Sequence, residues 1–512
     1  MQSKNFAFQF NLFCMIKKLF FLCSLNAICF GSYSQFKNSN WVFGDSVGFN
    51  FSTSQFYPTN CVSRGSCVSI SDSHDNLLLY AFTRAGLGDF TTLLFDGQDS
   101  LVLNGSNIIG QGWYHELILL PFPDDTNLFI LFSSGVVSIN EGLFYSIVQR
   151  TSNGYVMLSK NNLITKLKIC DGITAIKHGN GRDWWVTYRQ WSNTQNNEFY
   201  IVKVDPSGVS TPAITNIGTL LSPGFCNLKF NNQGNKLLRT HITGLLEMYD
   251  FDRCTGTMSN AQTIRNDSLG FPYQDELRFL WSAFSPNDSV FYVGTAGNAS
   301  YLYQFDLFAP NIYSSQVVLD TSSFCVDCGG EIKLAPDGKI YYTHAYWDGV
   351  NWNYPYPDTL YNMYNTYLGV INEPNKLGTA CNFQPFSFYL GGYRTYWGLP
   401  NNPNYELGPM VGSACDTLGL PNPSVGGALG TLSATFISVW NTLFVNAQHL
   451  RGKKAHVRIY SSLGVELFSS GSENTNGGYY TKDIRLPQLA TGVYIVNLIT
   501  EAEQLSVKFV VE

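Results

Sequence analysis

Eight acidic and histidine side chains are the residues of this sequence that could carry out chemistry together. Carboxylates and imidazoles that converge on one point can bind a divalent cation, and the cation can activate a water molecule for hydrolysis. Capping of strand ends and contact with solvent are the alternative roles for the same side chains. The candidates are His115, Glu116, Asp171, His241, Asp275, Glu276, Glu331 and His344.

A repeated phrase determines where these residues lie. The stretch LAPDGKIYYTH at residues 334–344 has looser copies in FSPNDSVFYVG, FNNQGNKLLRT and ISDSHDNLLLYAF. Each copy contains a turn rich in Asp, Asn, Gly and Pro between two apolar runs, because these residues form hairpin turns at low cost. The copies recur about every fifty residues, and each repeat holds about four strand-like runs. Such a repeat predicts the blades of a β-propeller.

The length of the repeat region bears on the number of blades. The region extends from about residue 41 to residue 400. It exceeds six repeats and falls a little short of seven, so we favour seven blades and keep six as the alternative. We expect WVFGDSVGFNF near the N-terminus to lie beside PFSFYLGGYRTYWGLP and close the seventh blade, since closure removes free strand edges.

The repeat also places the eight candidates. If the repeated turns lie on one face of the propeller, the starts of the first strands and the ends of the second strands lie on the other face. The candidates occupy those positions in the sequence. We therefore predict that they surround the mouth of the central channel, where a metal-dependent hydrolase would have its site.

Composition favours an all-β protein with more than one domain. Charged residues make up 13% of the 512 residues and aromatic residues 15%, with 46 Gly, which favours short strands and turns over helices. A chain of this length exceeds the size of one ordinary core. The formal net charge is -6 and no basic run is present, so nucleic acid is not expected as a partner.

The N-terminus predicts export. Residues 1–34 are predicted to be a signal peptide, with Met15 as an alternative start. A Lys pair, an apolar run and small residues follow one another after Met15, which is the pattern of such a peptide. No later segment is a membrane helix. Export makes local disulfides plausible, with Cys61 and Cys67 close enough to bridge, and Cys325 and Cys328 forming a lone CxxC.

The C-terminal part of the sequence lacks the fifty-residue repeat and differs from the propeller region in composition. A linker rich in Gly, Pro and Asn is predicted over residues 406–430, which assigns residues 35–405 to the propeller. Residues 431–512 contain about seven short alternating runs, and such runs predict a small β-sandwich.

This tail resembles a known sorting signal. VRIYSSLGVEL, LATGVYIVNL and the terminal LSVKFVVE resemble, in order and spacing, the type A C-terminal sorting domain of the type IX secretion system. The resemblance implies recognition by that machinery and transport across the outer membrane, to the cell surface or the medium. The family motifs fall on Gly492, Tyr494 and Lys508, whereas the acidic Glu512 departs from the usual basic end.

The propeller resembles a large group of uncharacterised propellers in such secreted proteins, through WVFGDSVGFNF, TAIKHGNGRDWWVTYR and LGVINEPNKLGTACNFQ. This resemblance supports the fold and implies no activity. No GxSxG, HExxH, Walker or EF-hand motif is present. We therefore expect a binding or adhesion module more than an enzyme, with the metal-dependent hydrolase as the alternative and no cofactor other than that divalent cation.

The ligand of such a module would be a glycan or a protein. An insert with the sequence YWDGVNWNYPYPD offers aromatic rings that could stack on a sugar or hold a partner, although they could also pack on the propeller. The four rings are Trp347, Trp352, Tyr354 and Tyr356.

Overall fold

The computed structural model consists mainly of strands, which confirms the all-β prediction. No helix among the described residues is long and apolar enough to cross a membrane. The predicted signal peptide, residues 1–34, lies outside the described residues. The structure describes residues 36–84, 91–111, 114–135, 142–170, 172–191, 194–222, 224–267, 277–295, 299–322, 328–345, 360–418, 431–448, 450, 452–461, 466–476, 478–500 and 504–511.

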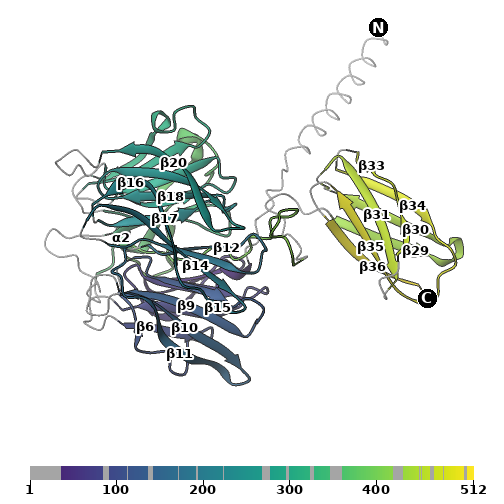
Figure 1. Cartoon of the computed structure of the whole chain (residues 1–512), viewed down its shortest axis with the longest axis horizontal. Coiled ribbons are helices and arrows are strands. Elements are labelled where there is room, and N and C mark those ends of the chain that lie inside the picture. Colours follow the sequence, from purple (N-terminus) through teal and green to yellow (C-terminus); the bar gives the residue numbers. More distant parts are fainter. Residues whose placement is uncertain are drawn as a thin grey trace, which may run out of the picture.

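Between residues 40 and 389, the described strands form seven small antiparallel sheets in which neighbouring strands are mostly consecutive in the chain. Figure 1 shows them in purple to green. The first sheet contains β1 (Asn40–Phe43), β2 (Asp45–Asn50) and β3 (Gln55–Val62). The second contains β4 (Cys67–Ser71), β5 (Leu77–Thr83), β6 (Thr91–Asp96) and β7 (Ile108–Ile109). The third contains β8 (Leu117–Pro121), β9 (Leu128–Gly135), β10 (Gly142–Thr151) and β11 (Gly154–Thr165).

The next four sheets continue this pattern. The fourth contains β12 (Thr174–Lys177), β13 (Trp184–Tyr188), β14 (Asn196–Asp205), β15 (Gly208–Val209) and β16 (Ala213–Leu221). The fifth contains β17 (Cys226–Phe230), β18 (Lys236–His241), β19 (Leu245–Asp252) and β20 (Thr257–Asn266). The sixth contains β21 (Phe279–Phe284), β22 (Val290–Thr295), β23 (Ser300–Asp306) and β24 (Val317–Ser322). The seventh contains β25 (Cys328–Leu334), β26 (Ile340–Ala345), β27 (Tyr367–Ile371) and β28 (Phe383–Tyr389).

Helical segments in the described part of the chain are short. They are η1 (Phe36–Asn38), η3 (Tyr313–Ser315), α2 (Met363–Thr366), η4 (Gly378–Cys381) and η5 (Ser438–Trp440).

Burial decreases from the first strand of a sheet to the last. β21, with the sequence FLWSAF, is buried throughout, whereas β24, the last strand of the same sheet, has no buried residue. First strands contact one another from sheet to sheet: β1 contacts β4, β4 contacts β8, and β17 contacts β21. Meanders whose first strands meet around one axis form a β-propeller, so the predicted fold type is confirmed.

The repeated phrase forms the turn between the first and second strands of a sheet, as predicted. Gly338 in APDGK has a φ of 78°, and Asp288 in SPNDS has a φ of 57°, a region that Gly, Asn and Asp tolerate best. Asp288 also accepts hydrogen bonds from the backbone N–H groups of Asn232 and Gln233 in the neighbouring sheet. The polar turns therefore join adjacent sheets as well as adjacent strands.

After β28 the chain returns to the axis, in a stretch that we call the axial segment (residues 394–410). The backbone N–H of Asn401 donates to Cys67 O in β4. Its side-chain amide donates to Leu117 O and Ile173 O, each at 3.0 Å. Tyr405 Oη donates to Leu119 O at 2.8 Å. The axial segment therefore lies where the first strands of several sheets converge.

The predicted closure of the ring is only partly correct. WVFGDSVGFNF and PFSFY lie against each other through side chains, with Phe49 and Phe388 ring centroids 5.1 Å apart. Arg394 Nε also donates to Asp45 Oδ2 at 2.6 Å. The two segments belong to different sheets, however, because β1 pairs with β2 and β28 pairs with β27. Side-chain packing and an isolated antiparallel bridge between Asp45 and Arg394, in which Asp45 N donates to Arg394 O at 2.8 Å, join the ends without a shared sheet.

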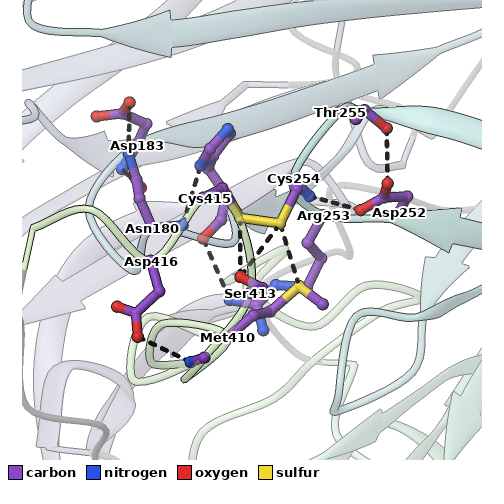
Figure 2. The surroundings of a disulfide bond; sticks show 12 residues. Asn180, Asp183, Asp252, Arg253, Cys254, Thr255, Met410, Ser413, Cys415 and Asp416 are labelled. Atoms are coloured by element: carbon purple, nitrogen blue, oxygen red, sulfur yellow. Dashed lines mark hydrogen bonds between the residues drawn. A yellow bond between two sulfur atoms is a disulfide. The ribbon is translucent and has the colours of Figure 1, made fainter.

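A disulfide joins Cys254, in the turn after β19, to Cys415, beyond the axial segment (Figure 2). Next to it, Met410 N donates to Gly179 O, and Arg253 Nη2 donates to Gly408 O at 2.6 Å. Residues 406–418, predicted as linker, are thus bound to the propeller. The cause is a distant cysteine partner that the local composition does not reveal.

The expected bridge between Cys61 and Cys67 is absent. Both residues are buried free thiols, and burial raises the pKa of each. They belong to β3 and β4, which lie in neighbouring sheets. Cys325 lies outside the described residues.

The C-terminal strands form two sheets (yellow in Figure 1). One contains β29 (Thr431–Ile437), β30 (Thr442–Gln448) and β34 (Tyr480–Arg485). The other contains β31 (Lys454–Ser461), β32 (Glu466–Ser469), β33 (Glu473–Asn474), β35 (Gly492–Thr500) and β36 (Gln504–Val511). Val445 of β30, Val457 of β31 and Val496 of β35 share one buried core.

Replacing both Cys254 and Cys415 with Ser should lower the free energy of unfolding of the propeller by about 2–5 kcal/mol, because the bond closes a long loop in the unfolded chain. The two cysteines are 161 residues apart. Urea denaturation followed by Trp fluorescence measures the change. Dithiothreitol should shift the parent protein to the same midpoint and leave the variant unchanged. Equal midpoints for both proteins would show that the bond does not stabilise this fold.

Candidate functional site

The structure brings two of the predicted histidine and acidic residues into contact, and a third follows one of them in the chain. His115 Nε2 lies 2.7 Å from Glu331 Oε1, and His115 Nδ1 lies 2.9 Å from the side-chain amide of Asn227. Glu331 also accepts a hydrogen bond from Leu399 N in the axial segment at 2.6 Å. The adjacent Glu116 accepts one from Tyr114 N at 2.8 Å. Each of the three acid and histidine side chains is buried.

The other two described members lie apart from this group. His241 Nδ1 lies 2.8 Å from Thr243 Oγ1, and burial followed by Arg239 lowers the pKa of His241 to about 3. The ring of His344 stacks on Phe386, with centroids 4.2 Å apart. Both histidines are buried.

These five side chains are buried, and His241 lines a small second pocket together with Arg189 and Arg239. A ring of all eight candidates around the channel mouth stays a prediction. Asp171, Asp275 and Glu276 lie outside the described residues, as do the aromatic candidates Trp347, Trp352, Tyr354 and Tyr356. Within the described ranges, no three His, Cys, Asp or Glu side chains form a group that could hold a metal ion.

Burial opposes the charge of Glu331, yet the pKa of its carboxyl is lowered. Burial raises this pKa, but the charge and hydrogen bond of His115 and the more distant Lys333 lower it further than burial raises it. A carboxylate surrounded by donors in this way stabilises the folded state as long as it is ionised. The group that we expected at the channel mouth therefore fastens the axial segment to β25.

A solvent-open pocket lies on the opposite face, beside the repeated turns. We call it the axial pocket. It forms where the ends of β12, β17 and β25 meet the axial segment. Its lining residues are Asn38, Thr174, Ala175, Ile176, Lys229, Phe230, Asn231, Asn232, Lys333, Leu334, Asn401, Asn402, Pro403 and Asn404.

Two lysines give the axial pocket its charge. Lys229 of β17 and Lys333 of β25 each stand next to last in their strand. Lys333 Nζ donates to Asn402 O in the axial segment at 3.1 Å. Burial and then Lys229 lower the pKa of Lys333 to about 7, against the opposing effect of Glu331. Burial also lowers the pKa of Lys229, and Glu331 again opposes the shift.

Most of the asparagines of the axial pocket are held by the scaffold. The side-chain amide of Asn402 donates to Asn38 Oδ1 at 2.7 Å and to Ser69 Oγ at 3.2 Å. Asn232 Nδ2 donates to Ser285 O at 2.7 Å, and Asn404 Nδ2 donates to Asn232 O at 3.2 Å. These bonds fix the walls of the pocket and leave the lysines as its distinctive groups.

We did not single out Lys229 and Lys333 from the sequence, although a signal was present. Both follow an apolar residue in a first strand, in NLKF and in EIKL, immediately before a copy of the repeated turn. A charged residue in a strand that is otherwise buried is unusual. Two of them at equivalent positions of two repeats predict a shared location at the axis.

The sorting candidates lie in the last two strands. Gly492 begins β35, and Tyr494 stacks on Phe509 of β36 while its hydroxyl donates to Ala490 O at 2.8 Å. Lys508 is exposed and stands opposite Ile495. Tyr494 therefore has a packing role, and Lys508 is available at the surface.

Residues 439–512 match the family described as a secretion system C-terminal sorting domain. The chain carries a type IX secretion sorting domain. The protein is therefore secreted by the type IX system, to the cell surface or the extracellular space. The sorting domain implies an interaction with the secretion machinery. No curated protein matches the sequence.

Solved structures with a similar fold have low sequence identity. The β-propeller domain of Cps50 (Swd1) from Myceliophteria thermophila is 12% identical, over 60% of this chain and 94% of that chain, with a TM-score of 0.36. Sqt1 from Chaetomium thermophilum is 14% identical, over 58% and 65%, with a TM-score of 0.35. PorZ, an essential surface component of the type-IX secretion system of Porphyromonas gingivalis, is 14% identical, over 91% and 62%, with a TM-score of 0.33.

Glu331→Gln should destabilise the propeller by about 1–3 kcal/mol at pH 7, because the charge-assisted bonds to His115 and Leu399 are lost. Since the folded pKa of Glu331 is lowered, its contribution is present above the unfolded pKa and is lost as the pH falls through the folded one. The difference between parent and variant should therefore shrink below about pH 4. Thermal melts from pH 3 to pH 8 measure it.

Glu373→Gln is the matched control, because its partner Lys376 is 3.6 Å away in an exposed pair. Exposed pairs contribute little. A melting difference for Glu331→Gln no larger than that of the control at pH 7 would contradict the role assigned to Glu331.

Proposed function

We propose that the protein is an exported seven-bladed β-propeller that acts as a binding module, with its ligand in the axial pocket. The observation that carries this proposal is the pocket itself, which is open to solvent at the point where first strands and the axial segment meet. Propellers present such a depression at the axis because the strands diverge from it. The sorting domain supports the location at which the module would meet its ligand.

The number of sheets supports a propeller of seven blades. Seven sheets lie between residues 40 and 389 in the described part of the chain, six of them with four or more strands and the first with three. We assign one blade to each sheet. The two C-terminal sheets share one core, so we assign them to a small β-sandwich that contains the sorting signal.

Binding fits the chemistry of the axial pocket better than hydrolysis. The lining provides ammonium and amide groups, and the amides are fixed by bonds to neighbouring strands. Fixed donors on rigid strands select a ligand by shape and hydrogen bonding. A glycan or a protein surface at the cell exterior is the ligand class that we propose.

Asn404→Trp should abolish ligand binding, because the bulky ring would fill the axial pocket. A glycan array and a panel of cell-surface proteins, probed with the secreted protein, would identify ligands and measure the loss. Ser259→Trp is the matched control, since Ser259 is exposed on the outer strand β20. Binding that survives in the Asn404 variant as well as in the control would place the ligand elsewhere. No ligand on either panel would contradict the binding module.

Removal of residues 432–512 should leave the propeller folded and change its destination. A domain joined by a linker shares few contacts with its neighbour. The shortened chain should accumulate in the periplasm of a host with type IX secretion, and the tail on an inert reporter with a signal peptide should carry the reporter out. Fractionation and immunoblotting measure both. Export of the shortened chain at the full level would show that the tail is not needed for sorting.

A further inference from the structure

We infer that the axial pocket takes an oxyanion group, such as a carboxylate, sulfate or phosphate, which pairs with Lys229 in front of Lys333. This inference rests on the proposed function and names the chemical class of its ligand. It starts from the surroundings of the two ammonium groups.

Lys229 differs in its bonding from the strand lysines Lys177 and Lys203. Within the described part of the chain, no hydrogen bond or ion pair joins its Nζ atom to another residue, although the residue lines the pocket. By contrast, Lys177 Nζ donates to Gly181 O at 3.0 Å, and Lys203 Nζ lies 3.2 Å from Asp205 Oδ2. A partly buried ammonium group is stable only with a counter-charge or acceptor, and for Lys229 the remaining space is the pocket.

The carboxylates near the two lysines are already engaged. Glu331 accepts from His115 and from Leu399 N. Asp288, behind the pocket wall, accepts from Asn231, Asn232 and Gln233. No Asp or Glu is among the residues that line the axial pocket. Two ammonium groups that face one opening without a carboxylate favour an anion in that opening.

The dependence of anion affinity on pH provides a second test of the oxyanion site. The charged and titratable groups that face Lys333 are Lys229 of β17, Glu331 of β25 and Cys67 of β4, and together with burial they hold the pKa of Lys333 at about 7. An anion binds the protonated amine more tightly than the neutral amine. Affinity for an anion should therefore fall as the pH rises from 6 to 8, through the pKa of Lys333.

The test compares two sugars that differ only at C6, where one has a carboxylate and the other a hydroxymethyl group, and a small free anion. Methyl β-glucuronide, methyl β-glucoside and inorganic phosphate would be titrated into the mature protein in low salt, with binding followed by calorimetry and ligand-observed NMR. We expect the glucuronide to bind and the glucoside not to bind. Phosphate that binds while the glucuronide does not would also support an oxyanion site, and would assign it to a small free anion.

Lys229→Gln should lower the affinity for the anion at least about tenfold, since a charge-assisted bond is lost. Lys339→Gln is the control, because Lys339 lies in the turn after β25 on the same face and carries the same charge. Lys333→Met should remove the fall in affinity between pH 6 and 8. Thermal melts of all variants exclude unfolding as the cause of any loss.

Three outcomes would overturn the inference. Equal binding of glucoside and glucuronide, or an anion affinity that Lys229→Gln leaves unchanged, would show that charge does not select the ligand. If neither the glucuronide nor phosphate binds at millimolar concentration, the axial pocket is not an oxyanion site. If an array ligand is lost in Asn404→Trp but not in Lys229→Gln, the proposed function stands and only the oxyanion fails. If an array ligand still binds the Asn404→Trp variant, the ligand does not occupy the axial pocket, and both proposals fail.

Discussion

The structure depends on the hydrogen bonds that the axial segment makes to the first strands. A first strand in a propeller has a neighbour on one edge only, so the backbone groups of its other edge need partners at the axis. The Asn401 amide joins Leu117 O to Ile173 O, and Tyr405 Oη reaches Leu119 O. The axial segment thus donates hydrogen bonds to backbone oxygens of strands from several sheets and fills the space between these strands.

The same bonds decide which face of the axis is closed. Toward the starts of the first strands, Leu399 N reaches the Glu331 carboxylate, and the His115–Glu331 pair is buried. Toward the turns, Asn402 directs its backbone oxygen at Lys333 Nζ and leaves a pocket open above it. Charge at the closed face is neutralised by pairing, whereas Lys229 at the open face has no hydrogen-bond or ion-pair partner in the described part of the chain.

Periodic features of the fold could be predicted from the sequence, and contacts made once could not. The fifty-residue repeat predicted the propeller and the position of its turns, and the family resemblance of VRIYSSLGVEL, LATGVYIVNL and LSVKFVVE predicted the sorting domain. The axial segment has no periodicity, and NNPNYELGP has the composition of a loop. Its function depends on partners far away in the chain, since Asn401 and Leu117 are 284 residues apart. For the same reason the sequence could not show that Leu399, far from Glu331 in the chain, donates a hydrogen bond to its carboxylate.

Export links the oxidation state of the chain to the geometry of the pocket. The Cys254–Cys415 bond can form only after the chain leaves a reducing cytoplasm. It fixes the chain just beyond Met410, where the axial segment leaves the axis. Because Asn402 and Asn404 line the pocket from that segment, restraint of its end also restrains the pocket wall. The disulfide, the axial segment and the two lysines therefore form one connected system, in which a bond that depends on export restrains the wall of the axial pocket.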